Sequence, residues 1–377
     1  MSFGRIVAWL ALSLALAGCA PTAHPAAQAA RHTGADDFKI GVMTGTVSQG
    51  EEEFRAGQQI ERTYGPRVRH ITYPDDFVQE QATVIAQLTG LAADPDIRVI
   101  VVSQAVPGSV AAARRIRQMR PDVLIGFVGA HEDADSVDQV CDIAIQADEL
   151  ARGATIVDTA HQMGARNFVH YSFPRHMAQP LLAARRDAMK LECAKRGMNF
   201  YFVTAPDPMG EGSLPEAQQF ILEDVPRQLA RLGKQTAFFC TNDGMQEPLI
   251  KSILAEGGLF VEQDAPAPTA GYPAALGLSI PAEHEDDMPW INAEIKRLIA
   301  ERGATGRFGS WVAPVSMVTT RAIAHLLVDA VDHRADCRDS STVARYVAAE
   351  CNGSPVKLRR YGPNSRQFLV ILDHVTY

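Results

Sequence analysis

The sequence predicts an α/β protein made of two hinge-connected lobes, each with a parallel β-sheet flanked by helices. Strand and helix patterns alternate from Phe38 onward with short connections, which is typical of parallel strands covered by helices. The first series of strands and helices ends near residue 160, where a helix leads away from the first sheet, and a second series begins at Phe168. The chain therefore contains two such series. The part of the chain after Cys19, about 358 residues, also exceeds the usual size of one domain.

The first series predicts an N-terminal lobe over residues 38–160. Strands are expected at 38–43, 68–73, 99–103, 123–128 and 141–147, and helices at 48–64, 78–91, 110–119 and 149–163. The third strand is almost continuously apolar, as expected for a strand covered on both faces. Ser48 is followed three residues later by Glu51, and this spacing predicts a capping box at the start of the first helix.

The second series predicts a C-terminal lobe over residues 161–310. Strands are expected at 168–172, 200–204, 237–241, 259–262 and 276–279, and helices at 177–195, 216–232, 246–256 and 290–299. Residues 311–377 are expected to return across the lobes, to form a helix at 318–331 and to end in a strand at 368–377. The Pro-containing stretch 309–314 is interpreted as the extended crossing, after which the final strand closes one of the sheets.

The first 37 residues have the features of an export signal followed by a tether. Arg5 precedes an apolar stretch at 6–16 that is too short to span a bilayer. Residues 16–19, Leu-Ala-Gly-Cys, resemble a bacterial lipobox. This resemblance implies that residues 1–18 are removed, that the Cys19 thiol carries diacylglycerol, and that the new amino terminus carries a fatty acid such as palmitate. Residues 19–37 are rich in Ala, Pro, His and Thr, which predicts a flexible tether between a membrane anchor and the folded body.

Composition narrows the classes of partner. No later run of 18 apolar residues occurs, which predicts a soluble body, and the mildly acidic charge includes no basic block suited to nucleic acid. Five cysteines remain after Cys19, so at least one thiol is free in an oxidising compartment. Cys337 and Cys351 either pair or stay reduced, whereas Cys240 is expected to be a buried small hydrophobe. The sequence has no cysteine or histidine spacing typical of zinc, and we expect neither a metal nor a cofactor.

The candidate ligand residues follow from one rule: in open α/β sheets, ligands bind outside the carboxyl ends of the strands. In the first lobe this rule selects Thr44, Thr46, Ser48, Gln49, Ser103, Gln104 and His131. In the second lobe it selects Ser172, Phe173, Arg175, Asp207, Asn242 and Asp243. Such hydroxyl, amide and carboxylate groups suit a polar, neutral or mildly charged small molecule, and Phe173 offers a ring for stacking.

Several of these residues have a structural alternative. The hydroxyls at residues 44–48 satisfy a turn and a helix start equally well. Asp207 with Pro208 is a common turn pair. His131, followed by acidic residues, fits either a metal site or a solvated loop, and the loop is favoured because no second histidine stands at ligand spacing. The acidic run at 51–53 would repel a phosphate at that helix end.

The two-lobe pattern behind a lipobox resembles the type I periplasmic solute-binding proteins. Residues 238–245, Phe-Phe-Cys-Thr-Asn-Asp-Gly-Met, are similar to the strand and Asn-Asp segment of the ribose-binding and LacI-type branch. That resemblance implies that Asp243 accepts hydrogen bonds from sugar hydroxyls. The alternative is that Asp243 caps the helix that begins near Gln246. The resemblance weakens at 246–248, where Gln-Glu-Pro replaces the small apolar residues usual in that branch.

Three longer segments resemble one uncharacterised family of bacterial lipoproteins, the family of unknown function numbered 3798 (DUF3798). These segments are residues 42–53, 241–248 and 261–273. The resemblance covers most of residues 38–377 and implies the periplasmic-binding fold and the cell envelope. It supplies no known ligand.

These observations favour a non-enzymatic, lipid-anchored receptor in the bacterial envelope. It would bind a small polar solute, with sugar-like molecules slightly favoured, in a cleft between the lobes and present it to an ABC-type permease or a sensor. An envelope hydrolase on the same fold is the second hypothesis, although the sequence has no GxSxG or HExxH motif. A structural or signalling lipoprotein without a ligand is the third.

Overall fold

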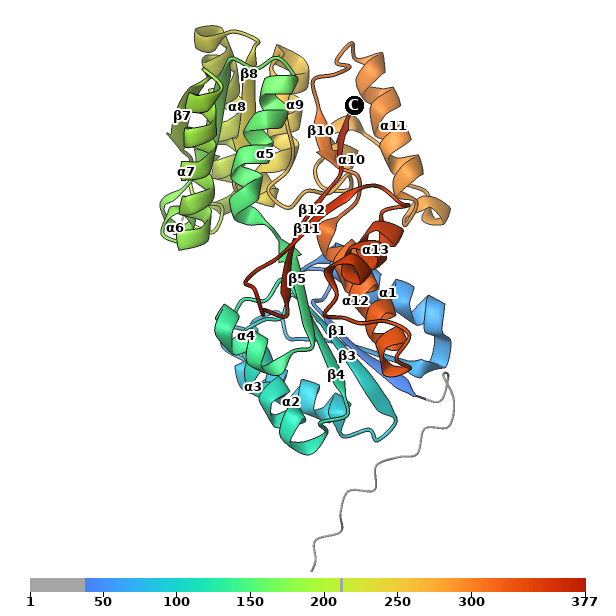
Figure 1. The fold of residues 1–377 in the computed structure, drawn as a ribbon. Helices are drawn as coiled ribbons and strands as arrows, with labels where there is room; N and C mark the ends of the chain where they lie inside the picture. The colour runs from blue at the N-terminus through green and yellow to red at the C-terminus, as the bar shows by residue number, and fades with distance from the viewer. Residues whose placement is uncertain (1–37, 211–212) are drawn as a thin grey trace, which may run out of the picture.

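The computed structural model describes residues 38–210 and 213–377, which form two α/β lobes (Figure 1). The expected signal peptide, the Cys19 lipid attachment and the tether lie outside the described residues. Within the described residues, no helix combines the length and the apolar character that crossing a membrane requires.

The first lobe is built on a seven-stranded sheet in the order β11-β12-β5-β4-β3-β1-β2. Its strands are β1 (Lys39–Thr44), β2 (Val68–Thr72), β3 (Ile97–Ser103), β4 (Leu124–Val128), β5 (Ile143–Ala147), β11 (Val356–Arg360) and β12 (Gln367–Leu372). All neighbours are parallel except β11 and β12, which form an antiparallel pair. In β3, Val99 and Val101 join one core cluster while Ile100 and Val102 join another, so both faces of the sheet are covered.

Helices from distant parts of the chain cover the two faces of this sheet. One side is covered by α2 (Gln81–Ala92), α3 (Ser109–Met119) and α4 (Ala134–Val140). The other side is covered by α1 (Glu51–Tyr64), α12 (Val315–Val331) and α13 (Ser340–Glu350). Gly126 in β4 permits the close approach of α12, because a Cβ there would lie 2.2 Å from the Ile323 Cγ2 atom.

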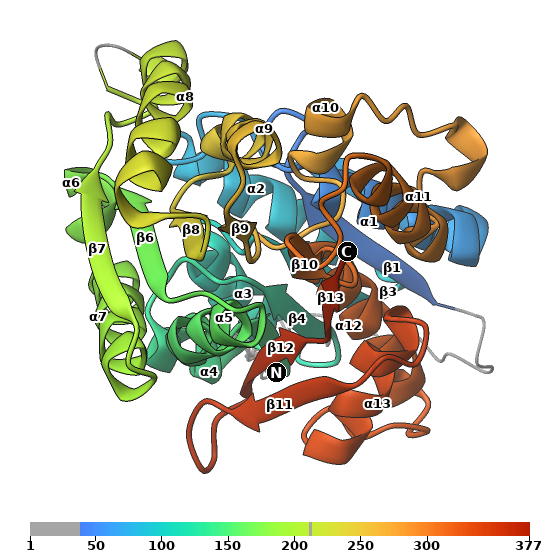
Figure 2. The same ribbon diagram turned by 90° about the horizontal axis from the view of Figure 1, so that it is seen from above.

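The second lobe has a parallel sheet in the order β7-β6-β8-β9, formed by β6 (Asn167–Ser172), β7 (Asn199–Thr204), β8 (Thr236–Cys240) and β9 (Leu259–Phe260). Helices α5 (Glu149–Gln162) and α7 (Pro180–Lys195) lie on one side, and α8 (Ser213–Leu232) and α9 (Gln246–Glu256) on the other (Figure 2). The short α6 (Pro174–Met177) follows β6. Beyond β9 lie α10 (Tyr272–Leu276), α11 (Met288–Glu301) and an antiparallel pair, β10 (Gly309–Trp311) with β13 (His374–Thr376).

The described chain passes between the lobes three times, and these passages form the hinge. It leaves the first lobe at Asp148, between β5 and α5, returns through residues 312–314 into α12, and leaves again at Asp373 between β12 and β13. Helix α5 packs on α7 and belongs to the second lobe, although the sequence pattern predicts residues up to 160 in the first. Of the segment 309–314 that was expected to cross, residues 309–311 form β10 in the second lobe and residues 312–314 make the passage.

Several local expectations are wrong for identifiable reasons. Ser48 does not cap α1, because the helix begins two residues later with Gly50 at its N-cap and without a side-chain cap. Residues 276–279 do not form a strand, because α10 ends at Leu276 and Gly277 turns with a φ of +68°. The last ten residues form two strands in different sheets, since the chain changes lobe at Asp373.

The described cysteines are all free thiols, so the alternative pairing of Cys337 with Cys351 does not form. Cys351 is buried at the end of α13, while the Cys337 thiol faces the carbonyl oxygen of Asp142. Cys240 is fully buried in β8, as its apolar surroundings in the sequence predict.

Candidate ligand-binding cleft

The carboxyl ends of both sheets face a cleft that contains two adjoining cavities, of about 380 Å³ and 190 Å³. Both are lined by residues of the two lobes and share Glu53, Gln104 and Ala265. The first turn of α12 also lines both, at Val315 and Ser316. The cleft is therefore an interlobe site at the strand ends, where open α/β sheets bind their ligands.

Four of the sequence-predicted residues line these cavities: Gln49, Gln104, His131 and Asp243. Gln104 is held in a left-handed conformation with a φ of +48° at the end of β3. Its Oε1 accepts a hydrogen bond from the Tyr73 hydroxyl at 3.2 Å, and its Nε2 donates to Glu53 at 2.9 Å. Its amide is thus positioned from both sides before any ligand arrives.

The other predicted residues of the first lobe are engaged in local hydrogen bonds. The Thr44 hydroxyl is buried and lies 2.8 Å from His70 Nε2. The Ser103 hydroxyl lies 2.7 Å from Thr320 Oγ1 of α12, which ties that helix to β3. These two side chains organise the strand ends rather than line the cavities.

The loop after β1 is held by hydrogen bonds to Asp75. The Thr46 and Ser48 hydroxyls donate to its carboxylate at 2.5 and 3.0 Å, and Gln49 Nε2 donates to its backbone oxygen at 3.1 Å. This arrangement matches the turn-satisfying alternative for residues 44–48, but with an aspartate acceptor that the sequence spacing did not identify.

In the second lobe, Arg175 and Asp207 form a two-point ion pair at 2.7 and 2.8 Å, and this pair holds the pKa of Asp207 below its usual range. Phe173 is fully buried, with the Arg175 guanidinium 5.1 Å from its ring centroid, so it offers no free face for stacking. Ser172 is also fully buried. Asn242 accepts a hydrogen bond from Gly244 N–H at 2.9 Å and shapes the turn after β8.

Asp243 projects its carboxylate into the smaller cavity. One oxygen accepts a hydrogen bond from the Ala265 N–H at 3.0 Å, and the side chain is reached by solvent through the cleft, although protein atoms of both lobes surround it. It does not cap α9, whose N-cap is Met245. Limited hydration between the lobes, together with the carboxylates of Asp264 and Glu52, raises the pKa of Asp243 to about 7.

Among the cleft residues that were not predicted as ligand residues, Glu52 and Glu53 were missed because they lie on a helix rather than at a strand end. Glu52 and Glu53 occupy the first turn of α1. Glu53 is only 6% exposed and lines both cavities. Glu52 accepts a hydrogen bond from the Thr269 hydroxyl of the second lobe at 3.1 Å, and desolvation raises its pKa. The acidic run at 51–53 was the only sequence signal for this carboxylate wall.

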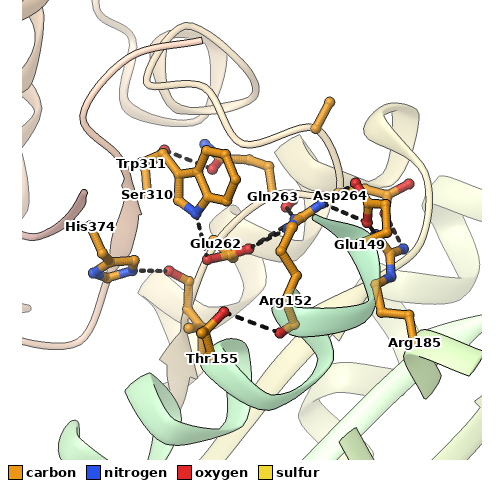
Figure 3. A network of polar contacts seen from close by, with 12 residues as sticks. Glu149, Arg152, Thr155, Arg185, Glu262, Gln263, Asp264, Ser310, Trp311 and His374 are labelled. Atoms are coloured by element: carbon orange, nitrogen blue, oxygen red, sulfur yellow. Dashed lines mark hydrogen bonds and ion pairs between the residues drawn. The ribbon is translucent and has the colours of Figure 1, made fainter. Parts of the chain in front are cut away.

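A buried polar network supports the cleft from the hinge side (Figure 3). Arg152, which is fully buried, donates to Glu149 at 2.9 Å and to Glu262 at 2.8 and 3.1 Å. Trp311 Nε1 donates to the second oxygen of Glu262 at 3.1 Å. Because Glu149 follows the first crossing and Trp311 precedes the second, the network joins two of the crossing segments.

Arg185 of α7 extends this network to the cleft. It pairs with Glu149 and with Asp264, so Glu149 lies between two guanidinium groups. Burial opposes the charge on Glu149, but Arg152 and Arg185 outweigh it and hold its pKa below its usual range. Glu149 lines the larger cavity as a neutralised carboxylate.

The described part of the chain contains no group of three or more His, Cys, Asp or Glu side chains arranged to hold a metal ion. His131 lies at the edge of the larger cavity beside Phe77, and desolvation lowers its pKa. Its neutral imidazole therefore adds a hydrogen-bonding group to the wall of the cavity rather than a positive charge.

The raised pKa of Asp243 predicts a pH dependence of stability in the ligand-free protein. Between about pH 4 and pH 7 the folded state holds a proton that the unfolded state releases, so this residue's contribution to stability falls as pH rises. Asp264 and Glu52 oppose its ionisation, whereas Arg152 favours it. We expect Asp243→Asn to become progressively more stable than wild type across this window in urea unfolding. A stability difference that is the same at pH 4.5 and pH 7.5 would disprove this assignment.

Comparison with known proteins places this architecture in a family. Residues 38–309 match the family described as "Protein of unknown function (DUF3798)". Two uncharacterised proteins of Treponema pallidum (strain Nichols) are 38% and 37% identical over 219 and 196 residues. These alignments cover 58% and 49% of this chain, and 99% and 88% of the two relatives.

Solved structures share the fold. A protein from Clostridium difficile 630 described as a candidate transcriptional regulator has a TM-score of 0.83 at 22% identity, covering 91% of this chain and 99% of its own. An ABC transporter periplasmic solute-binding protein from Actinobacillus succinogenes 130z with bound D-allose has a TM-score of 0.50 at 11% identity, covering 78% and 92%. A periplasmic ribose ABC transporter protein from Conexibacter woesei DSM 14684 has a TM-score of 0.50 at 12% identity, covering 79% and 87%.

At sequence identities of 11–22%, the matches to solved structures establish only the fold, whereas the match to the family establishes family membership. The two lobes, the three crossings and the parallel sheets are those of the type I periplasmic-binding fold. The chain belongs to the family of proteins of unknown function DUF3798.

Proposed function

We propose that this protein is a solute receptor, which binds a small polar molecule between its lobes and closes around it. The observation that carries the proposal is the pair of cavities lined from both lobes, with Gln104 and Asp243 projecting from opposite sides. A ligand held by both residues stabilises the closed arrangement, because it contacts the two lobes at once. Such binding needs neither a nucleophile nor a proton transfer.

Contacts across the cleft support a closing motion of the lobes. Helix α1 of the first lobe reaches the second lobe through Arg55, which pairs with Glu285 at 2.5 Å, and through Arg62, which pairs with Asp286. These partly exposed ion pairs are individually weak, so the lobes are able to separate. The three hinge segments allow that separation without disrupting either sheet.

The comparisons support an envelope role, and the remaining details form part of the proposal. The similar structures include a periplasmic protein with bound D-allose, which favours a small ligand rich in hydrogen-bonding groups. The receptor would be tethered to a membrane through lipid on Cys19 and would deliver its solute to an ABC-type permease or a sensor. The tether expected before Phe38 would leave the cleft free to reach such a partner.

Asp243→Ala is expected to weaken solute binding by roughly 1.5–3 kcal/mol, about ten- to a hundredfold, because a charged hydrogen-bond acceptor is lost. The solute is first identified by native mass spectrometry of freshly purified protein, and its affinity for each variant is then measured by titration calorimetry. Asp207→Ala is the matched control, since Asp207 pairs with Arg175 and does not line the cavities. Equal dissociation constants for wild type and Asp243→Ala would remove Asp243 from the site.

A further inference from the structure

We propose that the solute is a small organic cation, carrying an ammonium or guanidinium group as well as oxygen acceptors. This inference rests on the proposed receptor function and specifies its ligand. The smaller cavity is lined by three carboxylates, Glu52, Glu53 and Asp243. Among the described residues that line the two cavities there is no lysine or arginine.

Glu53 is the strongest single indication. Its side chain is more than nine-tenths buried and lines both cavities, and among the described residues it has a hydrogen bond from the Gln104 amide but no cationic partner. An ionised carboxylate that is removed from water without a counter-charge is strongly disfavoured. A positively charged ligand group in the cavity would supply the missing partner.

The nearby guanidinium groups do not neutralise the Glu53 carboxylate, because each of them forms ion pairs with other carboxylates. Arg152 and Arg185 are paired with Glu149, Glu262 and Asp264 on the hinge side. Arg55, two residues after Glu53 on α1, pairs with Glu51 and Glu285. The structural carboxylates of the region are thus neutralised within the protein, while those facing the smaller cavity are not.

The rest of the cleft indicates the uncharged part of the ligand. The larger cavity presents the amide groups of Gln104 and Gln146 and the imidazole of His131. The first turn of α12 reaches both cavities at Ser316 without a side-chain cap, so its free N–H groups suit oxygen acceptors of the ligand. A hydroxylated amine, such as an amino sugar, matches both parts, whereas a dicarboxylate would be repelled.

The test uses one matched pair, D-glucosamine and D-glucose, which differ in charge but little in shape, together with a second cation, agmatine, and an anion, succinate. Thermal unfolding and titration calorimetry are carried out on the purified full chain with D-glucosamine, D-glucose, agmatine and succinate. We expect the two amines to raise the unfolding temperature, D-glucosamine to bind at least tenfold more tightly than D-glucose, and succinate to have no effect. The amine affinity should fall with added NaCl, as expected for charge pairing in a solvent-accessible cleft.

Two variants connect the effect to the cleft. Glu53→Gln keeps the shape and the contact with Gln104 but removes the charge, so it should bind the amines at least tenfold more weakly. Glu223→Gln, which removes an exposed carboxylate on α8, should bind them like wild type. Asp243→Asn provides a second cleft variant in case Glu53→Gln fails to fold.

The outcomes separate the two proposals. If D-glucose binds as tightly as D-glucosamine, or if Glu53→Gln and Asp243→Asn leave the amine affinity unchanged, the cation inference is overturned while the receptor function stands. If none of the probes shifts the unfolding temperature at millimolar concentration and no small molecule co-purifies, both proposals are rejected.

Discussion

Replacing Arg152 with methionine is expected to destabilise the protein by about 3–5 kcal/mol, the usual cost of removing one partner from a buried ion pair. Methionine fills much of the same volume, but it leaves Glu262 buried without a cation and Glu149 with Arg185 alone. The loss should appear as a lower free energy of unfolding in guanidinium denaturation.

Arg297→Met is the matched control for this substitution. Arg297 makes ion pairs with Glu294 and Glu301, but it lies exposed on α11, where such pairs contribute about 0–1 kcal/mol. A loss below about 1 kcal/mol for Arg152→Met, equal to that of the control, would show that the buried network does not hold the hinge.

Trp311→Ala is the second substitution with a large expected effect, about 3–5 kcal/mol. The Trp311 ring is 1% exposed at the start of the second crossing, and the Arg152 guanidinium lies 5.3 Å from its centroid. Truncation opens a cavity and leaves one oxygen of Glu262 without its donor. The measurement is again the free energy of unfolding in denaturant.

Trp311→Phe separates the two contributions in this position. Phenylalanine keeps most of the packing but lacks the indole N–H, so it should cost roughly 1–3 kcal/mol, the penalty for an unsatisfied buried acceptor. A phenylalanine variant as unstable as the alanine variant would mean that the hydrogen bond to Glu262, rather than packing, dominates. Because Trp311 and Arg152 contact the same carboxylate, their losses should not be additive.

Most of the sheet strands could be predicted from sequence because their apolar residues are contiguous and local. In β3, Ile97–Ser103, successive apolar side chains alternate between the two core clusters that cover the faces of the sheet. Such an apolar run can be recognised without knowing which strands lie beside it. The edge strand β11, Val356–Arg360, was missed because basic residues alternate with partly buried ones. Its position depends on pairing with β12, which is a tertiary effect.

The candidate site was predictable at the level of loops but not of side chains. The strand-end rule selected the segments that carry Gln104 and Asp243, both of which line the cleft. The same rule selected Ser103 and Phe173, which are buried, because it does not state which way a side chain points. The strand-end rule did not select Glu53, because Glu53 lies on α1 and its place in the cleft depends on how that helix approaches the second lobe.

The central claim is that a solute binds between the lobes, and a co-crystal structure with the solute that co-purifies tests it most directly. We expect electron density for that molecule between Gln104 and Asp243, with a positively charged group beside Glu53. Density on the outer surface of one lobe, with the cleft filled only by water, would contradict it.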